Sequence, residues 1–362
     1  MLKHKLRVGV DVDDVLYSCV DYVCECINND HKVVPAIKAT DFSDWSHCSN
    51  PHYKLMYNYF KSPEFSANQP ILEGAKEFMA KLQEMCEVFI VSAVNHECMS
   101  VRAARIIADF NISSDHIILG SRKDLIELDV MLDDAAHNIL DSKATFPILF
   151  RRPWNQYLTG VLSVNTYDEV LEIIKTIEHQ IDPPKHPDLV CLVGPSGSNK
   201  NLMAKNLKEL GHVDLLLSTT TRPKYENEVE NETYEYITHD EYEQLLHNEQ
   251  FLERSVYANY HYGIKTSRIE EFMSKHDKIG LVCLDICGAM RLKSLYGNRV
   301  VLVFVKKDKK TLIENILNKN TNIHDHVNRI LAIETENKNR WLCDYLIENQ
   351  EQLIDLILKF KN

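Results

Sequence analysis

The chain has 362 residues, of which 44% are hydrophobic and 26% charged, a globular balance that excludes wholesale disorder. At roughly 150 residues per domain, this length suggests about two domains. Lysine and arginine number 41 against 53 acids, and the resulting net charge of −12 argues against a nucleic-acid binder. No apolar run approaches the roughly 18 residues that span a bilayer. The ten cysteines are scattered and no secretion signal precedes them, so we expect a cytoplasmic protein with reduced thiols and no membrane contact.

Short apolar runs rich in β-branched residues alternate with longer amphipathic stretches along the whole chain. Continuous runs of this kind are typical of strands buried on both faces of a parallel sheet, and their alternation with helices predicts an α/β architecture. We expect strands at residues 6–10, 88–91, 130–132, 189–193, 281–286 and 300–305. We expect helices at residues 75–84, 100–109, 167–179, 201–210 and 310–319.

Three prolines within residues 181–188 mark the expected boundary between two domains. Proline stops a preceding helix and stiffens a connector, and a new apolar strand starts immediately afterwards. We therefore expect a first domain at residues 1–182, a proline-rich linker at 183–188 and a second domain at 189–362.

The first expected strand ends in a group of acids. Asp11 and Asp13 are two residues apart, so on a strand they point the same way. Three acids within residues 11–14 repel one another unless a cation lies among them, and Mg²⁺ is the natural partner of carboxylate ligands. A loop of solvated aspartates is the alternative that this segment alone leaves open.

Three later positions extend this pattern. Ser92 ends the second expected strand, Lys123 supplies a cation, and Asp133 and Asp134 end the next strand ten residues after Lys123. This order resembles the haloacid dehalogenase-like phosphohydrolases, and within them the 5′(3′)-deoxyribonucleotidases, which also show a later Pro-Trp-Asn, here at residues 153–155. The resemblance covers about residues 5–180. It implies a HAD-like Rossmannoid domain with a small helical cap at about residues 17–70.

The resemblance also implies a role for each polar residue. Asp11 would attack phosphorus and form an aspartyl-phosphate, while Asp13 would protonate the leaving oxygen and then activate water. Ser92 and Lys123 would hold the phosphoryl oxygens. The Mg²⁺ ligands would be Asp11, the backbone carbonyl of Asp13, and Asp133 or Asp134.

Two features of this half lie outside the family motif. Asp14 stands where the family usually has glycine, and because aspartate tolerates turn conformations we expect the site to stay active. The cap is rich in aromatic residues, most of which we expect in a small cap core. Tyr17 and Trp45 are the candidates for stacking on a base.

The second half opens with an apolar strand, a Gly/Ser loop and a helix-like run. Gly194 and Lys200 match G-x-x-x-x-G-K-[ST], whereas Asn199 and Asn201 replace its second glycine and its hydroxyl residue. Such loops cradle phosphates with backbone N–H groups, although a chance Ser/Gly turn before a helix is a competing interpretation. Asparagine tolerates the left-handed conformation that this glycine position requires. The expected ATP-binding residues are Gly194, Pro195, Ser196, Gly197, Ser198, Asn199, Lys200 and Asn201.

The segments that follow resemble guanylate kinases. Residues 218–234 match the family's GMP-binding segment in the spacing from Arg222 to Tyr234, and residues 251–263 and 284–286 resemble two further family motifs. The resemblance covers about residues 189–362. It implies a P-loop kinase domain with ATP and Mg²⁺ as cofactors and nucleoside or deoxynucleoside monophosphates as acceptors. The acceptor would be held by Ser218, Arg222, Tyr234, Glu253, Tyr262 and Asp285, while Lys200 and Arg329 would stabilise the transferring charge.

Besides Asn199, several features depart from the guanylate kinase pattern. Ile264 and Cys287 replace two polar contacts to guanine, which suits a different base. Tyr225 replaces a second phosphate-binding arginine, and Lys319 is the nearest cation in a lid segment without arginine. Asn201 has no hydroxyl for Mg²⁺.

Together these observations predict a bifunctional enzyme, a Mg²⁺-dependent nucleotidase joined to a nucleoside monophosphate kinase with altered base specificity. The alternative is an active nucleotidase fused to a silent, kinase-shaped binding module. A polynucleotide end-healing phosphatase/kinase also pairs these chemistries, but the net charge of −12 speaks against it. One hypothesis is editing of a nucleotide pool for DNA synthesis, with one monophosphate removed and another promoted. The oligomeric state is left open, with a dimer as one option.

Overall fold

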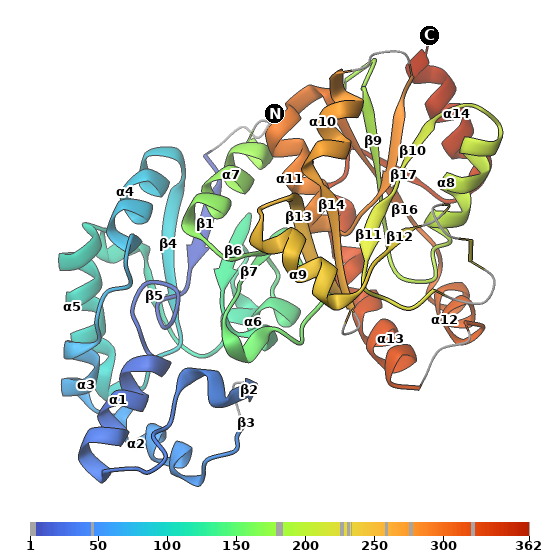
Figure 1. Cartoon of the computed structure of the whole chain (residues 1–362). Coiled ribbons are helices and arrows are strands. Elements are labelled where there is room, and N and C mark those ends of the chain that lie inside the picture. The colour runs from blue at the N-terminus through green and yellow to red at the C-terminus, as the bar shows by residue number, and fades with distance from the viewer. Residues whose placement is uncertain are drawn as a thin grey trace. The chain divides into compact units, whose positions relative to one another are not determined.

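The computed structural model describes residues 5–44, 47–178, 184–224, 228–229, 232, 234–257, 260–274, 278–319 and 323–361. The chain divides into two compact units (Figure 1). The first reaches Leu158 and includes Leu162–Ile174, and the second comprises Lys175–Asn362 with the short segment Thr159–Val161. This division falls within a helix, so the domain limits at residues 182 and 189 remain a prediction.

The first unit is built on a parallel six-stranded sheet with the strand order β5-β4-β1-β6-β7-β8. Its central strand β1 pairs with β4 and β6, so that Val10 lies opposite both Ile90 and Leu132. All three residues are fully buried, as expected for strands covered on both faces. The strands are β1 (Arg7–Val10), β4 (Glu87–Ser92), β5 (Ile117–Leu119), β6 (Val130–Asp133), β7 (Phe146–Phe150) and β8 (Ser163–Val164).

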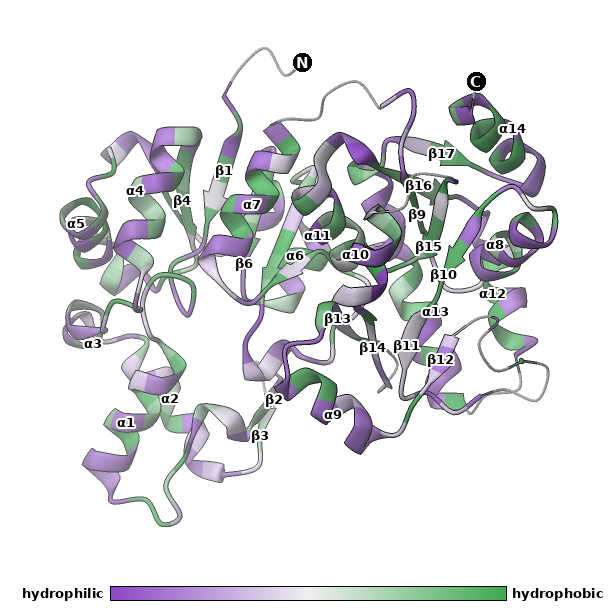
Figure 2. Ribbon diagram, turned by 45° about the horizontal axis from the view of Figure 1, so that its top comes forward, coloured by the Kyte–Doolittle hydropathy of each residue, from purple (hydrophilic) through white to green (hydrophobic). Residues whose placement is uncertain are grey.

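Helices connect these strands and pack on the sheet. Figure 2 shows hydrophilic and hydrophobic residues side by side on α4, as packing on one side requires. The helices are α4 (Ala75–Met85), α5 (Met99–Phe110), α6 (Ala136–Asp141) and α7 (Tyr167–Glu178), and the short 3₁₀ turns are η3 (His96–Cys98), η4 (Ser114–His116), η5 (Lys123–Leu125) and η6 (Pro153–Asn155).

The chain between β1 and α4 forms a small cap (Figure 1). The two ends of the cap meet, because Tyr17 bridges Ile71 and the Ser18 N–H donates to the Pro70 carbonyl at 2.8 Å. Apolar and aromatic side chains such as Phe42 pack into a core, which confirms the expected cap core. The cap elements are α1 (Val20–His31), η1 (Ala39–Asp41), β2 (Phe42–Asp44), β3 (His47–Cys48), η2 (Pro51–Leu55), α2 (Met56–Tyr59) and α3 (Pro63–Asn68).

The second unit contains a parallel five-stranded sheet with the order β10-β15-β9-β16-β17. Every residue of β9 and β16 is buried, and both runs consist only of Val, Leu, Cys and Phe. The strands are β9 (Leu189–Val193), β10 (Asp214–Leu216), β15 (Gly280–Cys283), β16 (Val300–Val305) and β17 (Tyr345–Ile347). The helices are α8 (Lys200–Glu209), α9 (His239–His247), α10 (Thr266–Ser274), α11 (Ile286–Tyr296), α12 (Lys309–Leu317), α13 (Ile323–Lys338) and α14 (Gln350–Lys361), with η7 (Gly297–Arg299) and η8 (Asn339–Leu342).

A second, mixed sheet in this unit has the order β12-β11-β14-β13. β11 is parallel to β12 and antiparallel to β14, and β13 and β14 form an antiparallel pair. Its strands are β11 (Ser218–Thr220), β12 (Tyr234–Tyr236), β13 (Phe251–Tyr257) and β14 (Tyr260–Lys265). This sheet carries four of the six expected acceptor residues.

The expected α/β class with two domains and parallel sheets is confirmed. One strand is shorter than expected, because β15 ends at Cys283 instead of continuing to residue 286. The Asp285 side chain accepts a hydrogen bond from the Gly288 N–H at 2.9 Å and so begins α11 as its N-cap. None of the helices in the described part of the chain is long and apolar enough to cross a membrane.

Candidate functional site

Three neighbouring strands of the first unit deliver the predicted phosphatase residues to one edge of the sheet. Asp11 follows β1, Ser92 ends β4 and Asp133 ends β6. Because these strands are parallel and adjacent, their carboxyl ends meet, which is where α/β sheets place their ligand sites. All three side chains are buried, and the Ser92 hydroxyl has no hydrogen-bond partner among the described residues.

Lys123 joins two of these carboxylates. Its Nζ lies 2.8 Å from Asp11 Oδ1 and 2.7 Å from Asp133 Oδ2, and its side chain is buried. Burial alone lowers the pKa of Lys123, but the two carboxylates raise it above its ordinary value, so the lysine stays charged. Burial raises the pKa of Asp11 to about 7 against the opposing effect of Lys123. The site is therefore a buried charge cluster with more acids than cations.

Asp133 and Asp134 differ in how fully their oxygens are occupied. Asp133 accepts hydrogen bonds from Lys123, from the Ala135 N–H at 2.8 Å and from Asn138 Nδ2. Asp134 accepts one from Trp154 Nε1 at 2.8 Å. Burial, reinforced by neighbouring acids, raises the pKa of Asp134 well above its usual value. Of the two acids, Asp134 is thus the one with room for a cation.

The donor set fits Mg²⁺. Carboxylate oxygens of Asp11, Asp133 and Asp134 lie within 4.8 Å of one another, and all three residues are buried. A hard divalent ion is held by such oxygen ligands and offsets their mutual repulsion. Trp154 belongs to η6, the Pro-Trp-Asn segment of the sequence motif, and this turn thereby supports the predicted ligand Asp134 through its indole N–H.

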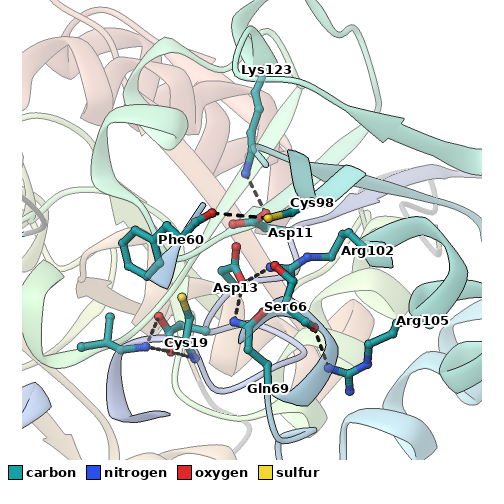
Figure 3. A network of polar contacts seen from close by, with 12 residues as sticks. Asp11, Asp13, Cys19, Phe60, Ser66, Gln69, Cys98, Arg102, Arg105 and Lys123 are labelled. Atoms are coloured by element: carbon teal, nitrogen blue, oxygen red, sulfur yellow. Dashed lines mark hydrogen bonds and ion pairs between the residues drawn. The ribbon is translucent and has the colours of Figure 1, made fainter. Parts of the chain in front are cut away.

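Asp13 is held by two residues that no motif marks. Its Oδ1 lies 3.0 Å from Arg102 Nη2 and accepts a hydrogen bond from Gln69 Nε2 at 2.9 Å. Arg102 comes from α5 and Gln69 from the end of the cap, as Figure 3 shows around Asp13. They are distant in sequence from Asp13 and lie in no recognisable pattern, so sequence reasoning did not find them.

Asp14 takes the place of the family glycine with a left-handed backbone, φ 55°. Its carboxylate accepts hydrogen bonds from the N–H groups of Cys19 at 2.9 Å and Val20 at 3.1 Å, at the start of α1. Burial raises the pKa of Asp14 to about 7. Aspartate here both adopts the turn conformation and satisfies N–H groups at a helix start, which glycine cannot do.

The expectation that Tyr17 offers a stacking face for a base is wrong. Its side chain is fully buried, its hydroxyl donates to Asp109 Oδ2 at 2.8 Å, and its ring packs against Phe110. The position at the start of the cap turns the ring into the core, where aromatic burial is favourable. Trp45 lies outside the described residues.

The loop after β9 has the geometry that a P-loop requires. Asn199 has φ 63°, the left-handed conformation expected for this glycine position. Gly197 has φ 84°, and a Cβ there would lie 2.5 Å from the Leu312 carbonyl oxygen. Lys200 Nζ donates to the Gly194 carbonyl at 2.7 Å. Pro195, Ser196 and Ser198 complete the loop in buried positions.

A carboxylate from α13 occupies one amide of this loop. Glu336 Oε2 accepts a hydrogen bond from the Ser196 N–H at 3.1 Å. Burial raises the pKa of Glu336 to about 7, opposed mainly by Lys200. Glu336 therefore contacts a group that a nucleotide phosphate would use, and the sequence motifs did not indicate it.

Cationic side chains gather beside the loop. Arg329 donates to Asp325 Oδ2 at 2.9 Å and to Ser196 Oγ at 3.0 Å. Burial and the positive charges of Arg329, Lys200 and Arg222 lower the pKa of Lys319 to about 8. A lysine whose charge is disfavoured by three neighbouring cations indicates a site built for anions.

The acceptor residues surround the mixed sheet. Arg222 is buried and its Nη2 contacts both carboxylate oxygens of Glu228 at 2.8 and 2.9 Å. Asn201 Nδ2 donates to the Tyr234 hydroxyl at 3.0 Å. A pocket brings expected and unexpected residues together, and it is lined by Asn201, Ala204, Leu215, Leu216, Ser218, Tyr234 and Cys283.

Glu253 faces the start of α11. Its Oε2 is buried without a hydrogen-bond partner in the described part of the chain, and burial together with Asp285 raises its pKa well above the usual range. Gly288 allows this approach, because a Cβ there would lie 2.6 Å from Glu253 Cδ. Burial raises the pKa of Tyr262, on β14, above its ordinary value. The charges of Arg329 and Arg222 oppose this rise, which places Tyr262 beside both cations.

The structure shows the surroundings of two of the residues that depart from the family pattern. Ile264 is fully buried and offers no polar atom to a base. The side-chain amide of Asn201 donates to the Tyr234 hydroxyl. Tyr225 lies outside the described residues.

Comparisons with known proteins divide the chain in the same way. Residues 5–180 match the family model "5′ nucleotidase, deoxy (Pyrimidine), cytosolic type C protein", and residues 186–359 match the guanylate kinase model. A guanylate kinase of Helicobacter pylori is 31% identical over 166 residues, which are 45% of this chain and 80% of that protein. A guanylate kinase of Fusobacterium nucleatum is 29% identical over 169 residues, 45% of this chain and 88% of its own length.

Two solved structures are also similar to parts of the chain. The guanylate kinase of Anaplasma phagocytophilum has a TM-score of 0.39 at 19% identity and covers 50% of this chain and 87% of its own. A haloacid dehalogenase-like hydrolase of Burkholderia xenovorans has a TM-score of 0.33 at 11% identity, with 47% and 96% covered. On the sequence relatives, this chain belongs through its C-terminal half to the guanylate kinase family, and its N-terminal half matches a 5′-nucleotidase family model.

Proposed function

We propose that the chain is a bifunctional nucleotide enzyme. The first unit would be a Mg²⁺-dependent (deoxy)nucleoside 5′-monophosphate phosphatase, and the second an ATP-dependent (deoxy)nucleoside monophosphate kinase with altered base specificity. The observation that carries the first activity is the buried cluster in which Lys123 bridges Asp11 and Asp133 at converging strand ends. Such a cluster is expensive to bury, and a structural role does not require the partnerless Ser92 hydroxyl beside it.

In the phosphatase, Asp11 attacks phosphorus as its ester bond to the nucleoside oxygen breaks, and Asp13 gives that oxygen a proton. A water molecule, which gives its proton to Asp13, then attacks the aspartyl-phosphate and releases inorganic phosphate. Lys123 and the Ser92 hydroxyl donate hydrogen bonds to the phosphoryl oxygens throughout. When bound by Asp11, Asp134 and the backbone carbonyl of Asp13, Mg²⁺ supplies charge neutralisation of the phosphate.

In the kinase, catalysis needs positioning and electrostatic stabilisation and no covalent intermediate. The backbone N–H groups of the loop at residues 194–201 and Lys200 hold the phosphates of ATP. Arg222, Tyr234 and Tyr262 hold the acceptor phosphate. Arg329 donates to the oxygens of the transferred group. Its contact with Ser196 Oγ in the loop supports this role.

The altered base specificity is argued from the acceptor side. Glu253 keeps a buried oxygen without a hydrogen-bond partner among the described residues, and this oxygen can accept from a base edge. Ile264 presents a buried alkyl group where the family has a hydroxyl, and Cys287 a thiol where it has a carboxylate. A base that needs fewer hydrogen-bond partners than guanine, such as a pyrimidine or a modified base, suits this set.

The second candidate is a kinase-shaped domain that binds nucleotide without transferring phosphate. It is favoured by the engagement of Lys200 with its own loop, of the Ser196 N–H with Glu336, and of Asn201 with Tyr234. The retention of Lys200, Arg222, Asp285 and Arg329 supports the active kinase over this candidate.

One screen tests both activities. The whole chain is incubated with Mg²⁺ and each common NMP and dNMP, with and without ATP, and free phosphate and nucleoside diphosphates are measured. Asp11→Asn should abolish only phosphate release, and Lys200→Ala should abolish only diphosphate formation on a different nucleotide. If no nucleotide yields a diphosphate, the second unit is a binding module. If both units prefer GMP, the proposal of altered base specificity and of pool editing fails.

A further inference from the structure

The general acid of the proposed phosphatase is held on one side only. Asp13 Oδ1 accepts hydrogen bonds from Gln69 Nε2 at 2.9 Å and faces Arg102 Nη2 at 3.0 Å. Among the described residues, no donor contacts its Oδ2. An oxygen with two donors cannot also carry a proton, so the transferable proton of Asp13 belongs on Oδ2. The two contacts thus fix both the orientation of the carboxyl group and the position of its proton.

Arg102 is more than a surface ion-pair partner. It is only 3% exposed, and its Nε and Nη1 have no hydrogen-bond partner in the described part of the chain. Within the part of the chain that the structure describes, its ion pair is with Asp13. A buried guanidinium with unsatisfied N–H groups lowers the stability of a fold, so a stabilising role does not explain it. A role in the reaction does, because Arg102 Nη2 directly contacts Asp13, the general acid of the proposed phosphatase.

Gln69 connects the same carboxylate to the cap. It directly follows α3 and precedes Pro70, whose carbonyl accepts the Ser18 N–H where the cap ends meet. α5 carries Arg102 and also contacts α3, the helix that leads to Gln69. Arg105, one turn after Arg102, donates to the Ser66 carbonyl of α3 at 2.9 Å (Figure 3). If the end of α3 moves away from α5, Gln69 leaves Asp13 while Arg102 stays.

We propose that Gln69 and Arg102 are positioning residues for Asp13, and that Gln69 makes proton transfer by Asp13 depend on the seating of the cap. Full acid catalysis then occurs only when the cap end lies on α5. This inference rests on the proposed phosphatase and extends it from the reacting groups to the residues that orient them.

The test compares two substrates with different need for an acid. A nucleoside monophosphate has a poor leaving group and depends on Asp13, whereas p-nitrophenyl phosphate has a leaving group that departs without a proton. The variants are Gln69→Leu, Arg102→Met and Arg102→Lys. Gln83→Leu is the matched control, because Gln83 donates only to backbone carbonyls of Met79 and Phe110, away from Asp13.

We expect Gln69→Leu and Arg102→Met to lower kcat/KM about tenfold or more on the nucleotide and less than about threefold on p-nitrophenyl phosphate, because kcat/KM reports only the steps up to departure of the leaving group and not the later hydrolysis of the aspartyl-phosphate. Arg102→Lys should recover part of the loss, and Gln83→Leu should change neither rate. Equal losses on both substrates, or no loss, would overturn the positioning role while leaving the phosphatase intact. If the wild-type chain hydrolyses neither substrate, or if Asp11→Asn leaves hydrolysis unchanged, the proposed function itself fails and this inference with it.

Discussion

Glu336→Gln tests whether the α13 carboxylate that contacts the phosphate loop makes the second unit sensitive to pH. In the structure, Glu336 Oε2 accepts a hydrogen bond from the Ser196 N–H at 3.1 Å. The substitution keeps an oxygen acceptor for this N–H and removes the ionisable group. Burial raises the pKa of Glu336 from 4.5 to about 7. The free energy of unfolding therefore changes with the ionisation of Glu336 mainly between pH 4.5 and about pH 7.

The sign follows from proton linkage. A carboxyl group whose pKa is raised by folding binds its proton more tightly in the folded protein, so the unfolded state loses the proton first as pH rises. The contribution of this group to folding is complete below pH 4.5 and is lost as pH rises through about 7. At 1.36 kcal/mol per pKa unit, the loss between pH 5 and pH 8 amounts to about 2 to 3 kcal/mol.

The assay is urea unfolding at pH 5, 6, 7 and 8 without nucleotide, read by pulse proteolysis with quantification of peptides from residues 189–361. Glu336→Gln should flatten the decline in unfolding free energy that the wild-type unit shows with rising pH. Glu334→Gln is the matched control, because Glu334 lies two residues before Glu336 on α13, is exposed, and pairs with Lys309 of α12. Equal slopes for wild type and Glu336→Gln would refute the reasoning.

Three further predictions follow from the two sites. Ile264→Ser combined with Cys287→Asp should raise kcat/KM for GMP about tenfold in a coupled kinase assay, because it restores two polar contacts to the base; an unchanged preference contradicts the altered base site. Asp14→Gly should lower the unfolding free energy of the first unit by about 1 kcal/mol through loss of the contacts at α1, with phosphate release within a few fold of wild type. Lys123→Met should abolish phosphate release and lower the unfolding free energy by about 3 kcal/mol in metal-free buffer, because two buried acids lose their cation; thermal melts with and without Mg²⁺ check this, and an unchanged melting temperature contradicts it.

The architecture and the convergence of Asp11, Ser92 and Asp133 were predictable from sequence because their signals are local. Asp11, Ser92 and Asp133 follow apolar runs directly, and parallel pairing of those runs brings their ends together without further information. Asn199 was predictable for the same reason, since its position within the loop dictates a left-handed backbone.

The supporting residues were not predictable, because their contacts join distant parts of the chain. Gln69 lies 56 residues after Asp13, and Arg102 lies further along the chain on α5. Neither residue lies next to a motif. Glu336 is one of several acids on α13, and only the packing of that helix selects it for Ser196. Tyr17 was misjudged because an aromatic residue at a cap entrance has the same sequence pattern whether it turns inward or outward.

The hydrogen bond between Asn201 and Tyr234 constrains how this domain can change. The side chain that stands at the hydroxyl position of the loop now supports a residue on the acceptor side. Serine at position 201 would supply a hydroxyl for Mg²⁺ and, because the side chain is shorter, would release the Tyr234 hydroxyl in the same step. One side chain thus joins the loop to the acceptor strand β12, so a substitution at position 201 alters both at once.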